Sequence, residues 1–60
     1  MTVELIDVDE AAELLKMTPR FVRRLVYERK VPFFKIGRYI RFDPADLEDW
    51  LKECRYERLR

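Results

Sequence analysis

The sequence predicts a mainly α-helical fold with one small β-hairpin, and three observations support this prediction. Two helix starts are marked by a capping residue followed by proline, at Thr18 and at Asp43. Residues 8–15 have apolar residues at helical spacing. After Pro32, residues of the same character recur at every second position, as in a β-strand. Because 60 residues suffice for one domain, we expect a single domain with its core at about 6–54 and a tail at 55–60.

The first helix is expected over residues 8–16. Asp7 is followed three positions later by Glu10, a spacing typical of a capping box, in which each side chain accepts a hydrogen bond from the other residue's backbone N–H. Apolar residues then recur along one helix face, at Val8, Ala11, Ala12 and Leu15. This pattern predicts a short amphipathic helix.

The second helix is expected over residues 19–29, with Thr18 as its N-cap. Only Met17 and its immediate neighbours separate it from the first helix, so the two helices should meet at the sharp corner of a helix-turn-helix. The second helix carries two stripes. The stripe expected to be buried consists of Val22, Leu25 and Val26, and the stripe expected to face outward consists of Arg20, Arg23, Arg24 and Tyr27.

A β-hairpin is expected from Pro32 to Phe42. It should turn at Gly37-Arg38, because glycine at the first central position suits a two-residue type II′ turn, and this turn places Arg38 at the tip. From the alternation we assign Phe34, Ile36, Ile40 and Phe42 to the inner face and Phe33, Lys35, Tyr39 and Arg41 to the outer face.

The third helix is expected over residues 44–56 and should close the core. Its apolar stripe consists of Leu47, Trp50, Leu51 and Cys54. On this stripe Cys54 behaves as a small hydrophobic residue, and Trp50 packs in the core, where its indole N–H needs an acceptor.

The net charge of +1 conceals three blocks of different sign. Residues 1–17 hold five acids and one lysine, a net −4, and residues 43–60 hold six acids and four bases, a net −2. Residues 18–42 hold eight bases and one acid, a net +7. Such a charge run is often only a solvated face, but here it coincides with the second helix of a tight corner and with the hairpin. We therefore expect this middle segment to dock on DNA while the acidic ends face away.

The composition argues against an enzyme and against a metal or cofactor site. The chain contains no Ser, Asn, Gln or His, so the usual hydroxyl nucleophile, general base and metal ligand are missing, and Cys54 is the single cysteine. No apolar stretch approaches the length of a membrane span, and the first residues do not resemble a signal peptide. We expect a soluble, cytoplasmic protein associated with the nucleoid.

The candidate DNA-binding residues lie on the second helix and the hairpin. Tyr39 stays open between cross-strand aromatic packing and a hydrogen bond to phosphate, whereas Phe33 is interpreted as structural. The carboxylates of the first and third helices are interpreted as solvated faces. The candidates are Thr18, Arg20, Arg23, Arg24, Tyr27, Lys35, Arg38, Tyr39 and Arg41.

Four segments together resemble the excisionase-type, MerR-like winged helix-turn-helix domains. They are residues 8–15, residues 32–36, the run Gly37-Arg-Tyr-Ile-Arg-Phe42 and the run Asp46-Leu-Glu-Asp-Trp-Leu51. The resemblance implies that the second helix enters the major groove and that the wing, from Lys35 to Arg41, lies on the backbone or in the adjacent minor groove. The family commonly has glycine where this chain has Lys16 and Arg29, so a positive φ at either position would strain the backbone by roughly 1 kcal/mol.

The resemblance also implies a biological role. Excisionases load on attachment-site DNA, bend it and help a separate integrase to favour excision. A single module buries little surface, so we expect cooperative self-association on DNA. The tail residues Arg55, Tyr56, Arg58 and Arg60 are the candidates for contacting the integrase or the next copy. A small transcriptional regulator with the same fold is the nearest alternative, and a protein-interaction module with a basic hairpin is an alternative of another class.

Overall fold

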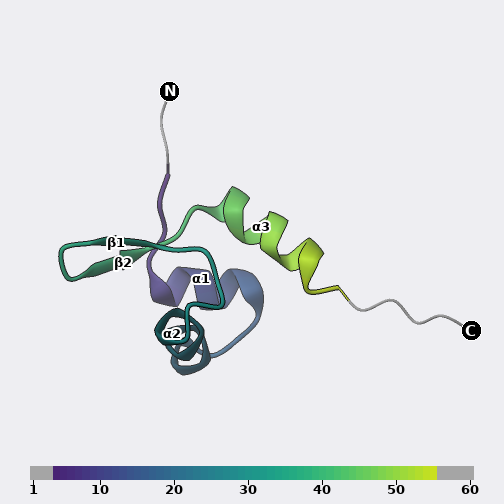
Figure 1. Ribbon diagram of the computed structural model, residues 1–60, viewed down its shortest axis with the longest axis horizontal. Coiled ribbons are helices and arrows are strands. Elements are labelled where there is room, and N and C mark those ends of the chain that lie inside the picture. Colours follow the sequence, from purple (N-terminus) through teal and green to yellow (C-terminus); the bar gives the residue numbers. More distant parts are fainter. Residues whose placement is uncertain (1–3, 56–60) are drawn as a thin grey trace, which may run out of the picture.

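The computed structural model describes residues 4–55 (Figure 1). Its elements follow one another in the order α1 (Val8–Leu15), α2 (Pro19–Tyr27), β1 (Phe34–Ile36), β2 (Tyr39–Arg41) and α3 (Pro44–Glu53). The three helices and the hairpin are those predicted, with each helix ending one to three residues earlier than expected. In Figure 1 the hairpin and α3 extend to opposite sides of the pair formed by α1 and α2.

Local sequence explains where α1 begins. The Asp7 side chain accepts a hydrogen bond from the Glu10 backbone N–H at 2.8 Å, and the Glu10 side chain accepts one from the Asp7 N–H at 3.0 Å. This is the predicted capping box, which satisfies two backbone donors that the first turn of a helix leaves without a partner.

Both helices of the corner end with a residue in the left-handed region. Lys16 has φ 60° and Arg29 has φ 58°, and the N–H of the following residue bonds back five positions, from Met17 to the Ala12 carbonyl and from Lys30 to the Leu25 carbonyl. This is the Schellman pattern, in which glycine is usual. The positive φ suspected at both positions is confirmed, and each costs about 1 kcal/mol of backbone strain.

The core forms where α1 and α2 cross. Ala11 and Ala12 of α1 are small, so that α2 can approach closely, and Phe42 and Leu47 close the core from the hairpin's end and from α3. The buried residues are Ala11, Ala12, Leu15, Val22, Leu25, Val31, Phe42 and Leu47. The apolar stripes predicted for α1 and α2 therefore face each other.

The hairpin has a two-residue turn and a firm base. Ile36 pairs with Tyr39 across Gly37-Arg38, and Gly37 has φ 62° whereas Arg38 is not among the residues with positive φ, as a type II′ turn requires. At the base, Ile6 and Phe42 exchange backbone hydrogen bonds of 2.9 and 2.8 Å. The segment leading into α1 is thereby fixed to the end of β2.

The predicted faces of the hairpin are wrong for β1. Phe34 and Ile36 are exposed rather than inward, whereas Phe33 packs against the core. The reason is the register: antiparallel partners share a face, and the two-residue turn pairs Ile36 with Tyr39 and Lys35 with Ile40. Because Ile40 and Phe42 face inward, the even-numbered residues of β1 must face outward.

Helix α3 closes the core only through its first two turns. Leu47 is fully buried, and the half-buried Trp50 donates its indole N–H to the Lys30 carbonyl at 2.8 Å, which supplies the expected acceptor. The prediction that Leu51 and Cys54 belong to the core is wrong, since Leu51 is 41% exposed and Cys54 is exposed. The C-terminal half of α3 extends past the α1–α2 pair (Figure 1).

A tight two-helix corner, a two-stranded wing and a third helix together make a winged helix-turn-helix, the predicted fold class. Within residues 4–55 no helix has the length and apolar character that a membrane span needs.

Candidate nucleic-acid interface

The outward stripe of α2 is fully presented to solvent. Thr18 caps the helix by accepting a hydrogen bond from the Phe21 N–H at 3.1 Å, and Pro19 occupies the first turn. With Val22 and Leu25 buried on one side, the 3.6-residue period turns the opposite stripe outward, and Tyr27 is 87% exposed. The side chains of this exposed stripe are Arg20, Arg23, Arg24 and Tyr27.

One arginine of the stripe already has an anionic partner. Arg24 Nε donates to Glu28 Oε2 at 3.1 Å, and Lys30 Nζ lies 3.4 Å from the other carboxylate oxygen. The hydrogen bond from Arg24, together with the charge of Lys30, lowers the pKa of the Glu28 carboxyl below its ordinary value. The i, i+4 spacing of Arg24 and Glu28 was a sequence signal for this pair.

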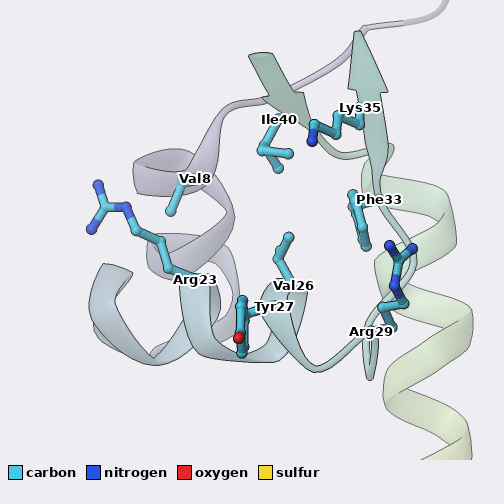
Figure 2. Close-up of a pocket in the computed structure, with 8 residues that line it drawn as sticks. All are labelled: Val8, Arg23, Val26, Tyr27, Arg29, Phe33, Lys35 and Ile40. Carbon is cyan, nitrogen blue, oxygen red and sulfur yellow. The ribbon is translucent and has the colours of Figure 1, made fainter. Parts of the chain in front are cut away.

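A groove of about 440 Å³ lies between α2 and the wing (Figure 2). Its apolar lining comes from three elements and consists of Val8, Val26, Phe33 and Ile40. Its polar lining consists of Arg23, Tyr27, Arg29 and Lys35. In Figure 2, Arg23 and Arg29 lie at the two ends of the groove, and Lys35 reaches toward it from the hairpin.

The tip of the wing combines two guanidinium groups with one aromatic ring. Arg38 and Arg41 lie over the Tyr39 ring, with their Cζ atoms 5.5 and 5.3 Å from its centroid. Arg41 also donates from Nη1 to the Ile40 carbonyl at 2.8 Å. These cation–π contacts hold both charges beside the turn. The aromatic packing that Tyr39 makes here is therefore with arginine, not with Phe33.

The expectation that the acidic N-terminal block faces away is wrong for Asp7 and Asp9. Both line a second hollow together with Arg23, Arg38 and Arg41. The cause is the bridge between Ile6 and Phe42, which starts α1 directly beside β2 and so places its first acids under the wing.

The acids of α3 lie elsewhere. Asp46, Asp49 and Glu53 surround a hollow next to Pro32 and Trp50. Helix α3, which carries these three acids, extends to the side opposite the wing (Figure 1). The expected separation of charge thus holds for these three acids of the C-terminal block.

The predicted site residues fall into three groups. Arg23, Tyr27 and Lys35 meet at the groove, and Arg38, Tyr39 and Arg41 gather at the wing, with Arg23 lining the hollows of both groups. Thr18, Arg20 and Arg24 instead surround Phe21 at the other end of α2.

Arg29 belongs to the groove and was not predicted, because it does not fall on the outward stripe that selected the others on the second helix. In the predicted tail, Arg55 is exposed and has an interaction partner, whereas Tyr56, Arg58 and Arg60 lie outside the described residues.

Comparison with known families settles the broad class. The model of a family described as a helix-turn-helix domain matches residues 5–55. The chain belongs to the helix-turn-helix domain family. Membership indicates binding of double-stranded DNA, and the family is typically non-enzymatic. No curated protein and no solved structure matches this helix-turn-helix domain.

Proposed function

We propose that this helix-turn-helix domain is an excisionase-type, MerR-like DNA-binding protein that loads cooperatively on attachment-site DNA, bends it and assists an integrase in excision. The observation that carries the proposal is the common groove of α2 and the wing, which Arg23, Arg29 and Lys35 line (Figure 2). A rigid helix and a hairpin flanking one basic groove can engage two adjacent grooves of one duplex.

In this proposal α2 lies in the major groove. Arg20 and Arg23 are the arginines available for bidentate contacts to guanine, because Arg24 is paired with Glu28. Without Asn or Gln the chain lacks the usual bidentate contact to adenine, so guanine should dominate the preferred site.

The wing supplies contacts that do not depend on sequence. Lys35, Arg38 and Arg41 would contact phosphates beside the groove that α2 occupies, and the phenol of Tyr39 is a further donor to phosphate. The Thr18 hydroxyl, although it accepts the cap hydrogen bond, still has its own proton to donate.

Salt dependence tests the electrostatic part of this proposal. With about five phosphate contacts, log K should fall against log salt with a slope near −4.5. Fluorescence anisotropy with a labelled duplex, measured over a range of salt concentrations, checks this value. A slope near zero would contradict binding through phosphates.

Footprinting on DNA that flanks the gene tests cooperative loading. The expected result is a set of protected direct repeats spaced by about one helical turn, 10–10.5 base pairs. The tail from Arg55 onward is proposed to contact the integrase or the next copy, so its deletion should weaken loading on repeats and leave binding to a single site unchanged. Equal cooperativity after the deletion would exclude the tail from this role.

An excision assay separates recombination from promoter control. If the protein is an excisionase, adding it to the integrase and attachment-site DNA should raise the yield of excised product. A small transcriptional regulator would instead change transcription from a neighbouring promoter and leave excision unaltered.

The apolar lining of the groove favours one candidate of another class. Val26, Phe33 and Ile40 beneath a cationic rim would also suit an acidic, apolar segment of a partner protein. A gel shift with random DNA at low salt distinguishes the two, because a module specialised for an acidic protein predicts no retarded band.

A further inference from the structure

The outer wing face, defined as Phe34, Ile36, Tyr39 and Arg41, has an unusual composition for a solvent-facing surface. Ile36 is 56% exposed, its cross-strand partner Tyr39 is 51% exposed, and Phe34 is 43% exposed. The opposite face of the hairpin packs toward the core through Phe33 and Ile40. The outer wing face therefore offers contiguous apolar surface that no other described element covers.

The charges around this surface favour a polyanion over a second copy of the chain. From Arg29 to Phe42 the sequence holds five bases and no acid, and Arg38 and Arg41 flank the apolar pair by lying over the Tyr39 ring. These bases outnumber the two acids, Asp7 and Asp9, that line the hollow beside the wing. Two such faces packed together would bring like charges into contact. A duplex offers phosphates to the guanidinium groups, and sugars and bases to the apolar side chains.

The dimensions restrict how the wing meets DNA. A two-stranded ribbon, with strands about 4.8 Å apart before side chains are counted, is too wide to lie flat in a minor groove about 6 Å wide. Only the residues nearest the turn can enter. Ile36 and Arg38 flank Gly37, whose lack of a side chain leaves the turn itself slim. Apart from Gly37 and these two neighbours, no atom of residues 4–55 lies within 4 Å of the place where a Cβ would stand.

We propose that Ile36 is an apolar wedge that presses into one base step of the minor groove, flanked by its cross-strand partner Tyr39. Wedges of this kind partly unstack a step and bend the duplex toward the major groove. Pyrimidine–purine steps unstack most readily, so the wing adds a preference for such a step, TA above all, without any hydrogen bond to a base. The proposal rests on the DNA binding proposed above.

The test compares Ile36→Thr with Phe34→Thr as a matched control. Both changes place a β-branched residue on the same face of the same strand, and Phe34 lies two residue pairs farther from the turn. Circular dichroism verifies that each variant is folded. Permanganate oxidation of thymines in the footprinted duplex reports unstacking, and energy transfer between dyes at the duplex ends reports bending.

Wild-type protein and Phe34→Thr should give a hyperreactive thymine at one step and a bent duplex, and Ile36→Thr should give neither. Affinity should fall by less than about fivefold in Ile36→Thr, because the lost contacts are offset by the deformation that is no longer required.

Persistent hyperreactivity and bending in Ile36→Thr would overturn the wedge, as would equal loss in both variants. The wedge would also be overturned if sedimentation showed that the free protein is a dimer and that both changes dissociate it. The outer wing face would then be a contact between two copies of the chain. If the wild type bends DNA but makes no thymine hyperreactive, the wedge fails while the proposed function stands. If it binds DNA without bending it, the wedge fails together with the bending part of the proposed function. If the wild type does not bind DNA at all, the proposed function itself fails.

Discussion

Helix α2 and the wing are both basic, but they present their charges in different ways. The arginines of α2 stand on a helix whose other face is buried through Val22 and Leu25, so their positions are set by the core. The wing holds Arg38 and Arg41 on a two-stranded hairpin that projects from the body, with apolar residues exposed beside them (Figure 1).

The difference separates two kinds of contact with a duplex. A side chain on a packed helix has a fixed register and can discriminate between bases, whereas a projecting hairpin is better suited to gripping the backbone and deforming the groove. The comparison predicts that changes in α2 alter which sequence is bound, and that changes in the wing alter how tightly any sequence is bound.

The largest effect is expected from Arg20→Ala or Arg23→Ala. Loss of a bidentate contact to guanine should cost about 1–3 kcal/mol at the preferred site and little at random DNA, so discrimination falls. Competition between specific and random duplexes measures this ratio. Arg23→Lys is the matched control, since it keeps the charge but not the forked geometry. If both duplexes weaken equally, α2 contacts only the backbone.

A smaller and uniform effect is expected from Arg38→Ala. Removing one phosphate contact at the wing should weaken specific and random DNA alike and reduce the magnitude of the salt slope by about 0.9. Anisotropy titrations at several salt concentrations on both duplexes measure this. A selective loss at the preferred site would show that the wing tip, too, recognises sequence.

Changing the two left-handed residues to glycine should improve stability by similar amounts. Lys16→Gly and Arg29→Gly each relieve about 1 kcal/mol of strain at a φ near 60°, and after the entropy cost of glycine each should add up to about 0.5 kcal/mol. In a chain this short, 1 kcal/mol raises Tm by about 4–8 °C, which thermal unfolding can resolve.

The variants Lys16→Gly and Arg29→Gly also test which part of the molecule contacts DNA. Arg29 lines the groove and Lys16 does not, so Arg29→Gly should weaken DNA binding while Lys16→Gly should leave it nearly unchanged. If the two variants bind DNA with equal affinity, the bound duplex does not contact the end of the groove at which Arg29 lies.

The smallest effect is expected from Glu28→Gln, which should strengthen binding to DNA by about two- to fivefold. The change releases Arg24 from its ion pair and removes a negative charge beside α2. Anisotropy at low salt, with Glu48→Gln on α3 as the control, measures the gain. No gain in Glu28→Gln would mean that Arg24 points away from the bound duplex.

The contribution of the Arg24–Glu28 ion pair to stability should depend on pH in a defined direction. Because the folded protein lowers the pKa of Glu28, the stabilisation by this pair is present above the unfolded pKa and is lost as the pH falls through the folded pKa. The pair is exposed, so its contribution is small. The wild type should be slightly more stable than Glu28→Gln at neutral pH, and this difference should disappear as the pH falls below the ordinary range of a glutamate, as thermal unfolding over a range of pH measures.

The sequence by itself determined the helices, their caps and the faces of the two-helix corner. Capping and helical periodicity act over three to seven residues, so Asp7, Thr18 and the two stripes of α2 could be assigned without knowledge of the rest of the fold. The basic character of residues 18–42 was likewise visible in the composition.

The tertiary structure decided the properties that depend on pairing between distant segments. The register across Gly37-Arg38 exposed Phe34 and Ile36 and turned Lys35 toward α2. The bridge from Ile6 to Phe42 brought Asp7 and Asp9 under the wing. A shift of one residue in register reverses every face of a strand, and only packing against a core can choose between the two alternatives.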